Sequence, residues 1–287
     1  MIKPGYLQRS SFQRQFRRRV RQPGILAFAA VTLILLVLIA LLAPVLAPHP
    51  PYQQHLDARF QKPFTQGFLL GTDSLGRDVL SRLMYGGRSA FIVGLVSTGI
   101  ALIIGATVGI LASYGPRWMD SLFMLLMDGL LAMPTILMAV AIVAVFGYGL
   151  VQVMLAMGIV FSPLIARLMR AELKRASGQD FVEAEILVNT PGPEIFFTAI
   201  LPQVFPPLLV QLTSLFAAAI TIEASLSFLG IGIQPPGSSW GIMLDNARDY
   251  LISAPWLAFP PGIALALAVY SLNTLGDHIN DLFHRHH

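Results

Sequence analysis

Long apolar runs, separated by short polar segments, constrain this 287-residue chain more than any other feature. Each run of about 20 apolar residues is long enough to cross the ~30 Å hydrocarbon core of a bilayer as an α-helix. Charged residues make up only 12% of the chain, compared with about 25% in soluble domains. The mean hydropathy is +0.68. The sequence therefore predicts an all-α, multi-pass membrane protein without a sizeable soluble domain.

We expect six transmembrane helices in one membrane domain, residues 25–281. The expected spans are about 25–47, 89–113, 118–146, 150–169, 201–229 and 256–275. A basic segment (1–24) comes before them, a polar loop (48–87) follows the first span, and a short tail (282–287) ends the chain. The second span contains Gly94, Gly99, Gly105 and Gly109. Because small residues let helices approach closely in lipid, this span is expected inside the bundle.

The distribution of Lys and Arg indicates the topology. The segments on the side of the two termini hold 13 of the 19 Lys and Arg residues. Cytoplasmic loops carry an excess of these residues. Both termini and the polar loop 170–200 are therefore expected in the cytoplasm. The same bias explains the net charge of +4, so we expect no nucleic-acid partner.

The sequence lacks the motifs of an enzyme or a metal protein. It has no G-x-x-x-x-G-K-[ST] phosphate loop, no H-E-x-x-H and no G-x-S-x-G. It also has no Cys, and the His-rich end is more typical of an exposed terminus than of a metal site. We expect a non-catalytic chain that binds no metal. Two acids within spans, Asp128 and Glu223, either line a pathway or hydrogen-bond between helices.

The polar loop 170–200 predicts a short helix over residues 181–189. Asp180 is a candidate N-cap, Pro191 and Pro193 end the helix, and Asn189 tolerates a left-handed helix end. A helix of this length is not stable alone in water. Its apolar residues must pack on the protein's own helix ends or in a groove of a separate protein. These residues are Phe181, Val182, Ile186 and Val188.

The same loop carries a family resemblance. Glu183-Ala184, followed by Leu201-Pro202, resembles the cytoplasmic "EAA" loop of ABC importer permeases. Other motifs match the dipeptide/oligopeptide/nickel permease family, C-type subunit, over about residues 15–281. They are Leu70 to Arg82, Asp128 with Pro134, Asp180 to Ala184, Glu223 to Gly230, Pro236 with Trp240-Gly241, Ala254 to Trp256, and Asn273 with Gly276-Asp277. The chain departs from the family pattern at Asn189 (usually Gly), Ala199 (usually His), Leu125 (often Arg) and the C-terminal end.

The resemblance implies an ABC type I importer permease (MetI-like) fold, with a cytoplasmic coupling helix that transmits ATPase movement to the spans. It implies transport of peptides, or of nickel, metal chelates or glutathione-like solutes. The implied partners are a homologous B-type permease, an extracytoplasmic binding protein and two cytoplasmic ATPases, which hold ATP and Mg. This chain would bind no cofactor of its own. The implied coupling residues are Asp180, Phe181, Val182, Glu183, Ala184, Glu185, Val188, Asn189 and Gly192. Because Leu125 replaces the family's Arg, Asp128 is expected to lack that partner.

Two loops on the opposite side allow two interpretations. Segment 70–82 contains Asp73, Arg77, Asp78 and Arg82. It either contacts a binding protein or covers the pathway, or it is a structural turn with Thr72 or Asp73 capping the next helix. Loop 231–255 has the same ambiguity, and Trp240 and Trp256 could simply anchor at the membrane interface.

Two other classes of protein remain open. An ion-coupled secondary transporter would be complete as a single chain and would contain broken helices. Asp128 with Pro134 favours this class weakly. An intramembrane enzyme is disfavoured by the missing nucleophile or metal constellation.

Overall fold

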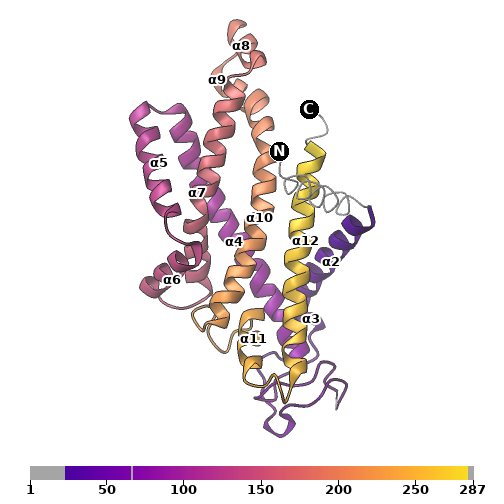
Figure 1. Ribbon diagram of the computed structural model, residues 1–287. Helices are drawn as coiled ribbons and strands as arrows, with labels where there is room; N and C mark the ends of the chain where they lie inside the picture. The colour runs from indigo at the N-terminus through magenta and orange to yellow at the C-terminus, as the bar shows by residue number, and fades with distance from the viewer. Residues whose placement is uncertain (1–22, 66, 284–287) are drawn as a thin grey trace, which may run out of the picture.

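The computed structural model describes residues 23–65 and 67–283, which form a bundle of helices (Figure 1). The α-helices are α2 (Pro23–Leu41), α3 (Ala43–Leu46), α4 (Val79–Tyr114), α5 (Arg117–Leu131), α6 (Thr135–Phe146), α7 (Leu150–Ser177), α8 (Asp180–Leu187), α9 (Gly192–Ile195), α10 (Leu201–Phe228), α11 (Trp240–Arg248) and α12 (Phe259–Phe283). Two 3₁₀ turns, η1 (Leu56–Ala58) and η3 (Pro255–Leu257), and a π-helical segment, η2 (Phe196–Ile200), complete the elements. Most of the basic N-terminal segment and the His-rich end lie outside the described residues.

Within the described residues, five helical rods are long and apolar enough to cross a bilayer. They are α2, α4, α7, the continuous rod α9–η2–α10, and η3–α12. Helices α5 and α6 form a further pair, bent by 93°, and the number becomes six if this pair is one span. The span expected over 118–146 is therefore made of two helices joined at a sharp bend. The bend lies next to Pro134, the residue before α6, where a helix cannot keep its backbone hydrogen bonds.

Several helices are longer than the apolar runs that predicted them. Helix α4 begins at Val79 rather than near residue 89, so the polar loop after the first span is shorter than expected. Helix α7 continues to Ser177, beyond the expected residue 169. Hydropathy marks only the part of a helix that lies in lipid, whereas the helix itself continues until its backbone is capped.

The central packing confirms that the Gly-rich second span lies inside the bundle. Helix α4 packs along α7 and α10, while α12 packs against α10 and α2. A Cβ atom added at Gly105 would lie 2.6 Å from the carbonyl oxygen of Ser162 on α7. A Cβ atom added at Gly109 would lie 2.8 Å from the carbonyl oxygen of Ala166. Only glycine permits this approach, although Gly99 faces open space.

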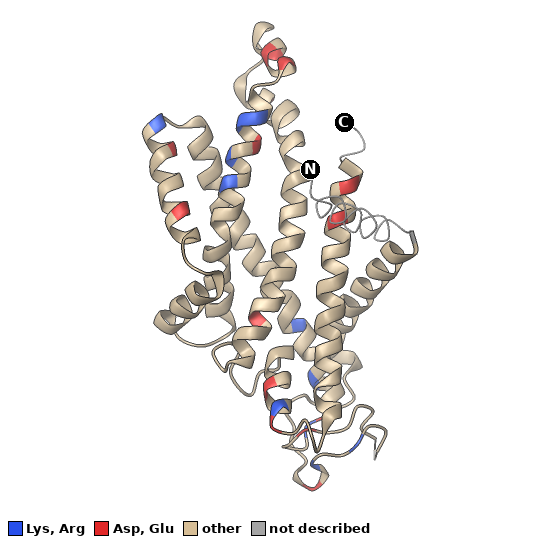
Figure 2. Ribbon diagram, viewed as in Figure 1, with Lys and Arg blue, Asp and Glu red and all other residues tan. Residues whose placement is uncertain are grey.

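The two ends of the bundle differ in structure. One end carries α8 and α9 together with the last turns of α12, and we call it the α8 end (Figure 1). The opposite end carries segment 48–78, α11 and the 249–255 turn, and we call it the loop end. Figure 2 shows most of the charged residues gathered towards these two ends, as expected for helices that cross a bilayer.

Candidate functional site

Helix α8 is the short helix that the polar loop predicts, and it projects from the end of α7 (Figure 1). Gln179 is the N-cap residue, so the expectation that Asp180 would cap the helix was wrong. The carbonyl oxygen of Gln179 accepts a hydrogen bond from the backbone N–H of Val182 at 2.9 Å. Asp180 and Glu183 instead lie in the first turn, where the helix dipole favours negative charge.

The apolar side chains of α8 are divided between the protein and the solvent. Val182 is buried in the same apolar cluster as Leu173 of α7 and Ile195 of α9, and Phe181 packs against that cluster. Ile186, Leu187 and Val188 are exposed, and Leu187 has 83% of its surface accessible. One face of α8 therefore holds it on the bundle, while its far end presents three consecutive apolar side chains to the surroundings.

The turn after α8 uses Asn189 where the family usually has Gly. Asn189 has a φ of 59°, and its N–H donates to the carbonyl of Ile186 at 3.0 Å. Asn is among the few residues that adopt this left-handed conformation readily. The Oγ1 of Thr190 donates to the Glu185 carboxylate at 2.7 Å, which fixes the exit of the chain. Gly192 is the first residue of α9 and has Pro193 beside it, so Gly192 does not supply the turn.

At the loop end, the four charged residues of segment 70–82 are almost completely buried. The Asp73 carboxylate accepts hydrogen bonds from the backbone N–H groups of Leu75 and Arg77, both at 2.9 Å. It also accepts one from Arg77 Nε at 2.7 Å, and Arg82 Nε lies 3.7 Å away. This closed arrangement supports the interpretation of the segment as a structural turn.

The residue that caps α4 is Asp78, and neither Thr72 nor Asp73 does so. The Asp78 carboxylate accepts from the backbone N–H of Ser81 at 3.0 Å and from its hydroxyl at 2.6 Å. Thr72 instead accepts from the Gln61 N–H at 2.9 Å and donates to the Ala58 carbonyl. These two hydrogen bonds join the residues just before α4 to an earlier part of the polar loop.

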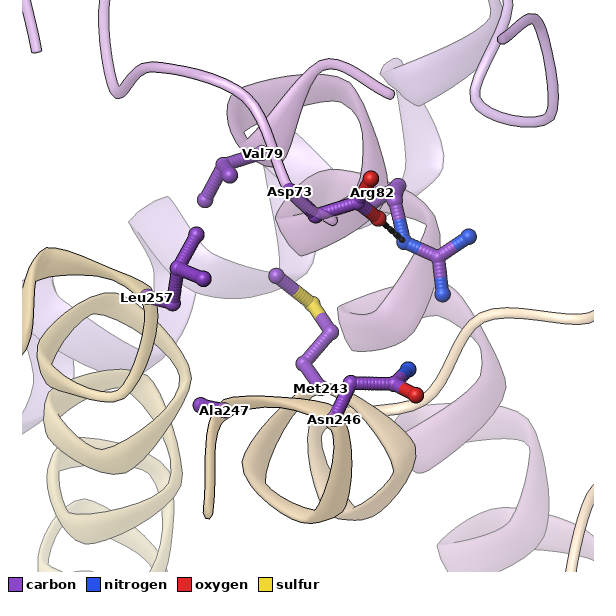
Figure 3. A pocket seen from close by; sticks show the side chains of 7 residues that line it. All are labelled: Asp73, Val79, Arg82, Met243, Asn246, Ala247 and Leu257. Carbon is purple, nitrogen blue, oxygen red and sulfur yellow. Dashed lines mark ion pairs between the residues drawn. The ribbon is translucent and has the colours of Figure 1, made fainter. Parts of the chain in front are cut away.

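Loop 231–255 is joined to the start of α4. The Ser238 hydroxyl donates to the Arg82 carbonyl at 2.8 Å, and the Trp240 indole N–H donates to the Leu83 carbonyl at 3.0 Å. Trp240 is buried, so it is not the interfacial anchor that the sequence allowed. A cavity of about 20 Å³ separates this loop from α4 (Figure 3). Its lining residues are Asp73, Val79, Arg82, Met243, Asn246, Ala247 and Leu257.

This cavity is too small for a transported solute. Arg82 is only 2% exposed, and its Nη1 and Nη2 have no hydrogen-bond partner among the described residues. A volume of about 20 Å³ is sufficient for one ordered water molecule. We regard the cavity as part of the structural joint between α4 and α11.

The two acids within the expected spans have different environments. Glu223 is fully buried near the end of α10, and its carboxylate accepts a hydrogen bond from Ser227 at 2.7 Å. The Ser227 hydroxyl in turn accepts from the Ile233 N–H at 3.2 Å, which supports a packing role for Glu223. Asp128 is exposed and lies 3.6 Å from Arg167 on α7. Asp128 therefore has a basic partner, although not the one at the family position.

Sequence reasoning missed a stronger charge cluster between α5 and α7. Asp120 accepts hydrogen bonds from Arg170 and Lys174, each at 2.7 Å. The available signal was an acid at the start of one predicted span and bases at the end of the next. Among the described residues, no group of three or more His, Asp or Glu side chains is placed to hold a metal ion.

The fold and these sites agree with the class that known proteins define. Residues 79–286 match the family described as binding-protein-dependent transport system inner membrane component. Residues 11–63 match the N-terminal transmembrane domain of oligopeptide transport permease C. The chain belongs to this family of ABC importer permeases, within its DppC/OppC-like branch. It is thus a transporter subunit of the inner membrane.

Individual relatives agree with this assignment. The chain is 42% identical, over 254 residues, to the di/tripeptide transport system permease protein DppC of Pseudomonas aeruginosa (strain UCBPP-PA14), covering 87% of this chain and 84% of that protein. It is 35% identical, over 268 residues, to the glutathione transport system permease protein GsiD of Pectobacterium atrosepticum, covering 93% and 89%.

Among solved structures, the methionine ABC transporter MetNI in an inward facing conformation matches with a TM-score of 0.58 and 18% identity. That match covers 70% of this chain and 95% of the other. At this identity the likeness concerns the fold alone, and it confirms the expected MetI-like permease fold.

Proposed function

We propose that this chain is one of two permease subunits of an ATP-driven importer for peptides, and that α8 is its coupling helix. The observation that carries the proposal is the division of α8 into a buried face and an exposed end. Val182 fixes the helix to the core that contains α7, while Ile186, Leu187 and Val188 are free to enter a groove of another protein. An amphipathic helix seated in a groove is a common recognition mode.

The energy for transport would come from separate chains. The sequence has no phosphate loop of its own, so ATP and Mg would be held by two ATPase subunits at the α8 end. The excess of Lys and Arg on the side of the α8 end supports a cytoplasmic location for the α8 end and for both termini. A homologous B-type permease would supply the other half of the pathway, and an extracytoplasmic binding protein would deliver the solute.

Peptides are the substrate class that the relatives favour. The relative with 42% identity is a di/tripeptide permease by its name, and the one with 35% identity is a glutathione permease. Glutathione is itself a small peptide-like acid, so the two descriptions share one chemistry. Nickel and metal chelates receive less support, because neither of these relatives is named for them.

Exchange of Glu183-Ala184 for Lys-Asp tests the coupling role. We expect membrane insertion to be unchanged and the association with the ATPases to weaken by about 1–3 kcal/mol, because polar groups buried at the contact would lose their partners. Co-purification of the ATPases and ATP-driven uptake of a labelled dipeptide measure the effect. Glu194→Lys is the matched control, since Glu194 is exposed on α9. Wild-type co-purification of the Lys-Asp variant would contradict the coupling role.

The alternative of an ion-coupled transporter, which the sequence left open, conflicts with the family to which the chain belongs, although the bent pair α5–α6 is a broken helix of the kind such transporters use. Asp128 near the bend is exposed and paired with Arg167. The purified single chain in vesicles decides between the two functions. Solute uptake driven by an ion gradient without ATP would support this candidate and exclude the importer subunit.

A further inference from the structure

An open ion pair lies between α5 and α7. The Asp128 carboxylate on α5 is 3.6 Å from Nη1 of Arg167 on α7, and each side chain has 59% of its surface exposed. This distance is longer than that of a hydrogen bond, in which the N and O atoms lie about 2.7–3.2 Å apart. Both groups therefore keep most of their capacity to bind other charged groups.

A neighbouring ion pair between the same two helices is closed. Asp120 on α5 accepts hydrogen bonds from Arg170 and Lys174, each at 2.7 Å, and its side chain is only 19% exposed. Figure 2 shows the acidic positions of α5 beside the basic positions in the last turns of α7. Because the closed pair already holds α5 on α7, the open pair is not needed to join the two helices.

Asp128 lies deep in the layer that the apolar helices cross. Trp118, at the start of α5, is 65% exposed, and Trp residues are enriched at the membrane–water interface. Asp128 is about 15 Å further along α5 at 1.5 Å per residue, which is about half the thickness of the hydrocarbon core. The short side chain of Asp does not reach the headgroups from there. Charged side chains at this depth face protein or water rather than lipid.

The break between α5 and α6 is an independent indication of water on this face. Helix α5 ends at Leu131, one turn after Asp128, and residues 132–135 at the 93° bend are all exposed. Irregular backbone at membrane depth leaves polar groups without helical partners, and it is tolerated only where protein buries it or water reaches it. Because this chain does not bury the break, either a water-filled space or a partner chain must cover it.

The chemistry of the open pair favours a solute over a partner chain. A peptide carries an ammonium group at one end and a carboxylate at the other, and its side chains can carry either charge. A carboxylate such as Asp128 accepts hydrogen bonds from an ammonium group, whereas Arg167 can bind a carboxylate through two parallel hydrogen bonds. A partner chain that covered the pair would remove both charges from water, which costs free energy. A water-filled pathway for peptides avoids that cost.

We propose that Asp128 and Arg167 line the solute pathway and form a charge site, at which the charged groups of the transported peptide are bound in passing. This inference rests on the proposed importer function. Asp128 contacts ammonium and guanidinium groups, and Arg167 contacts carboxylates. Because the two charges are opposite, the intact charge site accepts peptides of either sign, and each residue favours the peptides that its partner disfavours.

The first experiment measures the charge preference of uptake by the complete transporter in liposomes, with the binding protein saturated with peptide. Uptake of labelled alanyl-lysine is divided by uptake of labelled alanyl-glutamate. We expect Asp128→Asn to lower this ratio and Arg167→Gln to raise it, each by roughly threefold, the size expected for one exposed charge contact. Glu172→Gln is the matched control, because Glu172 pairs with Arg175 on the same helix α7, and we expect a wild-type ratio.

Opposite shifts distinguish the charge site from a structural contact, since loss of a structural contact would slow the uptake of both peptides alike. An unchanged ratio in both variants, or a shift in the same direction, would overturn the charge site and leave the importer function intact. A wild-type transporter that takes up neither peptide with ATP would overturn the importer function, and the charge site with it.

The second experiment tests whether water reaches the break between α5 and α6. Because the chain has no Cys, Ala132→Cys gives it a single thiol, and the unsubstituted transporter measures labelling of the other subunits. In the complete transporter, a charged thiol reagent should modify position 132 faster than position 31 of the Val31→Cys variant, since Val31 is an exposed residue of the apolar span α2. Quenching of a fluorophore at position 132 by brominated lipid would place the break in lipid, and slow modification without quenching would place it against the partner permease. Either result would overturn the proposal.

Discussion

Asp120 on α5 accepts a hydrogen bond from Arg170 on α7, with 2.7 Å between Oδ2 and Nη2. Lys174, one turn further along α7, donates to the same oxygen. Two bases on one helix therefore hold one acid on its neighbour, shortly before α7 leads into α8. Movement of α8 would reach α5 through this contact as well as through apolar packing.

The Asp120 contact can be tested by exchange of charge. Asp120→Lys should lower the unfolding temperature of the purified complex. The double variant Asp120→Lys/Arg170→Asp should recover part of the loss, because an ion pair of opposite polarity forms again. The side chains are partly exposed, so we expect about 1 kcal/mol for the pair. Asp249→Lys, at an exposed position, is the control. A double variant as unstable as the sum of the two single changes would show that the pair contributes nothing.

The buried charges of segment 70–82 predict an order of stability effects. Asp73→Ala would leave Arg77 and Arg82 without their shared carboxylate and should destabilise by about 3–5 kcal/mol. Asp78→Ala, which removes the cap of α4, should cost about 1–2 kcal/mol. Asp57→Ala, at an exposed position, should be neutral. Thermal unfolding together with proteolysis of the 48–78 segment measures the series. Equal behaviour of the Asp73 and Asp57 variants would refute the structural role of Asp73.

The close packing of α4 on α7 predicts different effects at two glycines of the same helix. At Gly109 a new Cβ would lie 2.6 Å from the Cβ of Met169, so Gly109→Val should destabilise by about 1–3 kcal/mol. Gly99→Val is the control, because nothing lies within 4 Å of a Cβ added there. The unfolding temperatures of the two variants in detergent give the comparison. A loss at position 99 as large as that at 109 would contradict this arrangement of the helices.

The left-handed conformation of Asn189 predicts which residues the turn after α8 accepts. Asn189→Gly should be neutral, since glycine adopts a φ of 59° freely. Asn189→Val should cost about 1–2 kcal/mol, because the Cβ meets the following carbonyl oxygen. Proteolysis near residue 189 and ATPase co-purification report the effect. If the Val variant behaved as the Gly variant does, the turn would have a different conformation in the assembled transporter.

The apolar runs were sufficient to predict the membrane class, the approximate spans and the Gly-rich interior helix. The short α8 could also be predicted, because Asp180 to Pro193 combines a helix start, an acidic first turn and two helix breakers within one polar stretch. These features depend on residues that are close in the sequence. A bilayer also requires each span to be a helix of sufficient length with its backbone hydrogen bonds satisfied.

The remaining features depend on contacts between distant segments. The hydropathy around Val79 does not mark the start of a helix. The start is set by Asp78, which caps the helix only when the loop folds around it. The burial of Trp240 requires the carbonyl of Leu83, more than 150 residues away. The pairing of Asp128 with Arg167 likewise depends on how α5 lies against α7, and a single sequence does not give that geometry.

Helix α4 has 36 residues, which at 1.5 Å per residue corresponds to about 54 Å, nearly twice the thickness of a ~30 Å hydrocarbon core. Part of α4 is therefore expected to extend beyond the hydrocarbon core, and its first turns carry the joint with α11. In a stiff helix of this length, a small tilt moves the two ends a long way. A tilt of about 10° displaces its two ends by roughly 9 Å relative to each other. A small rotation where α4 packs on α7 would thus become a large displacement at the loop end.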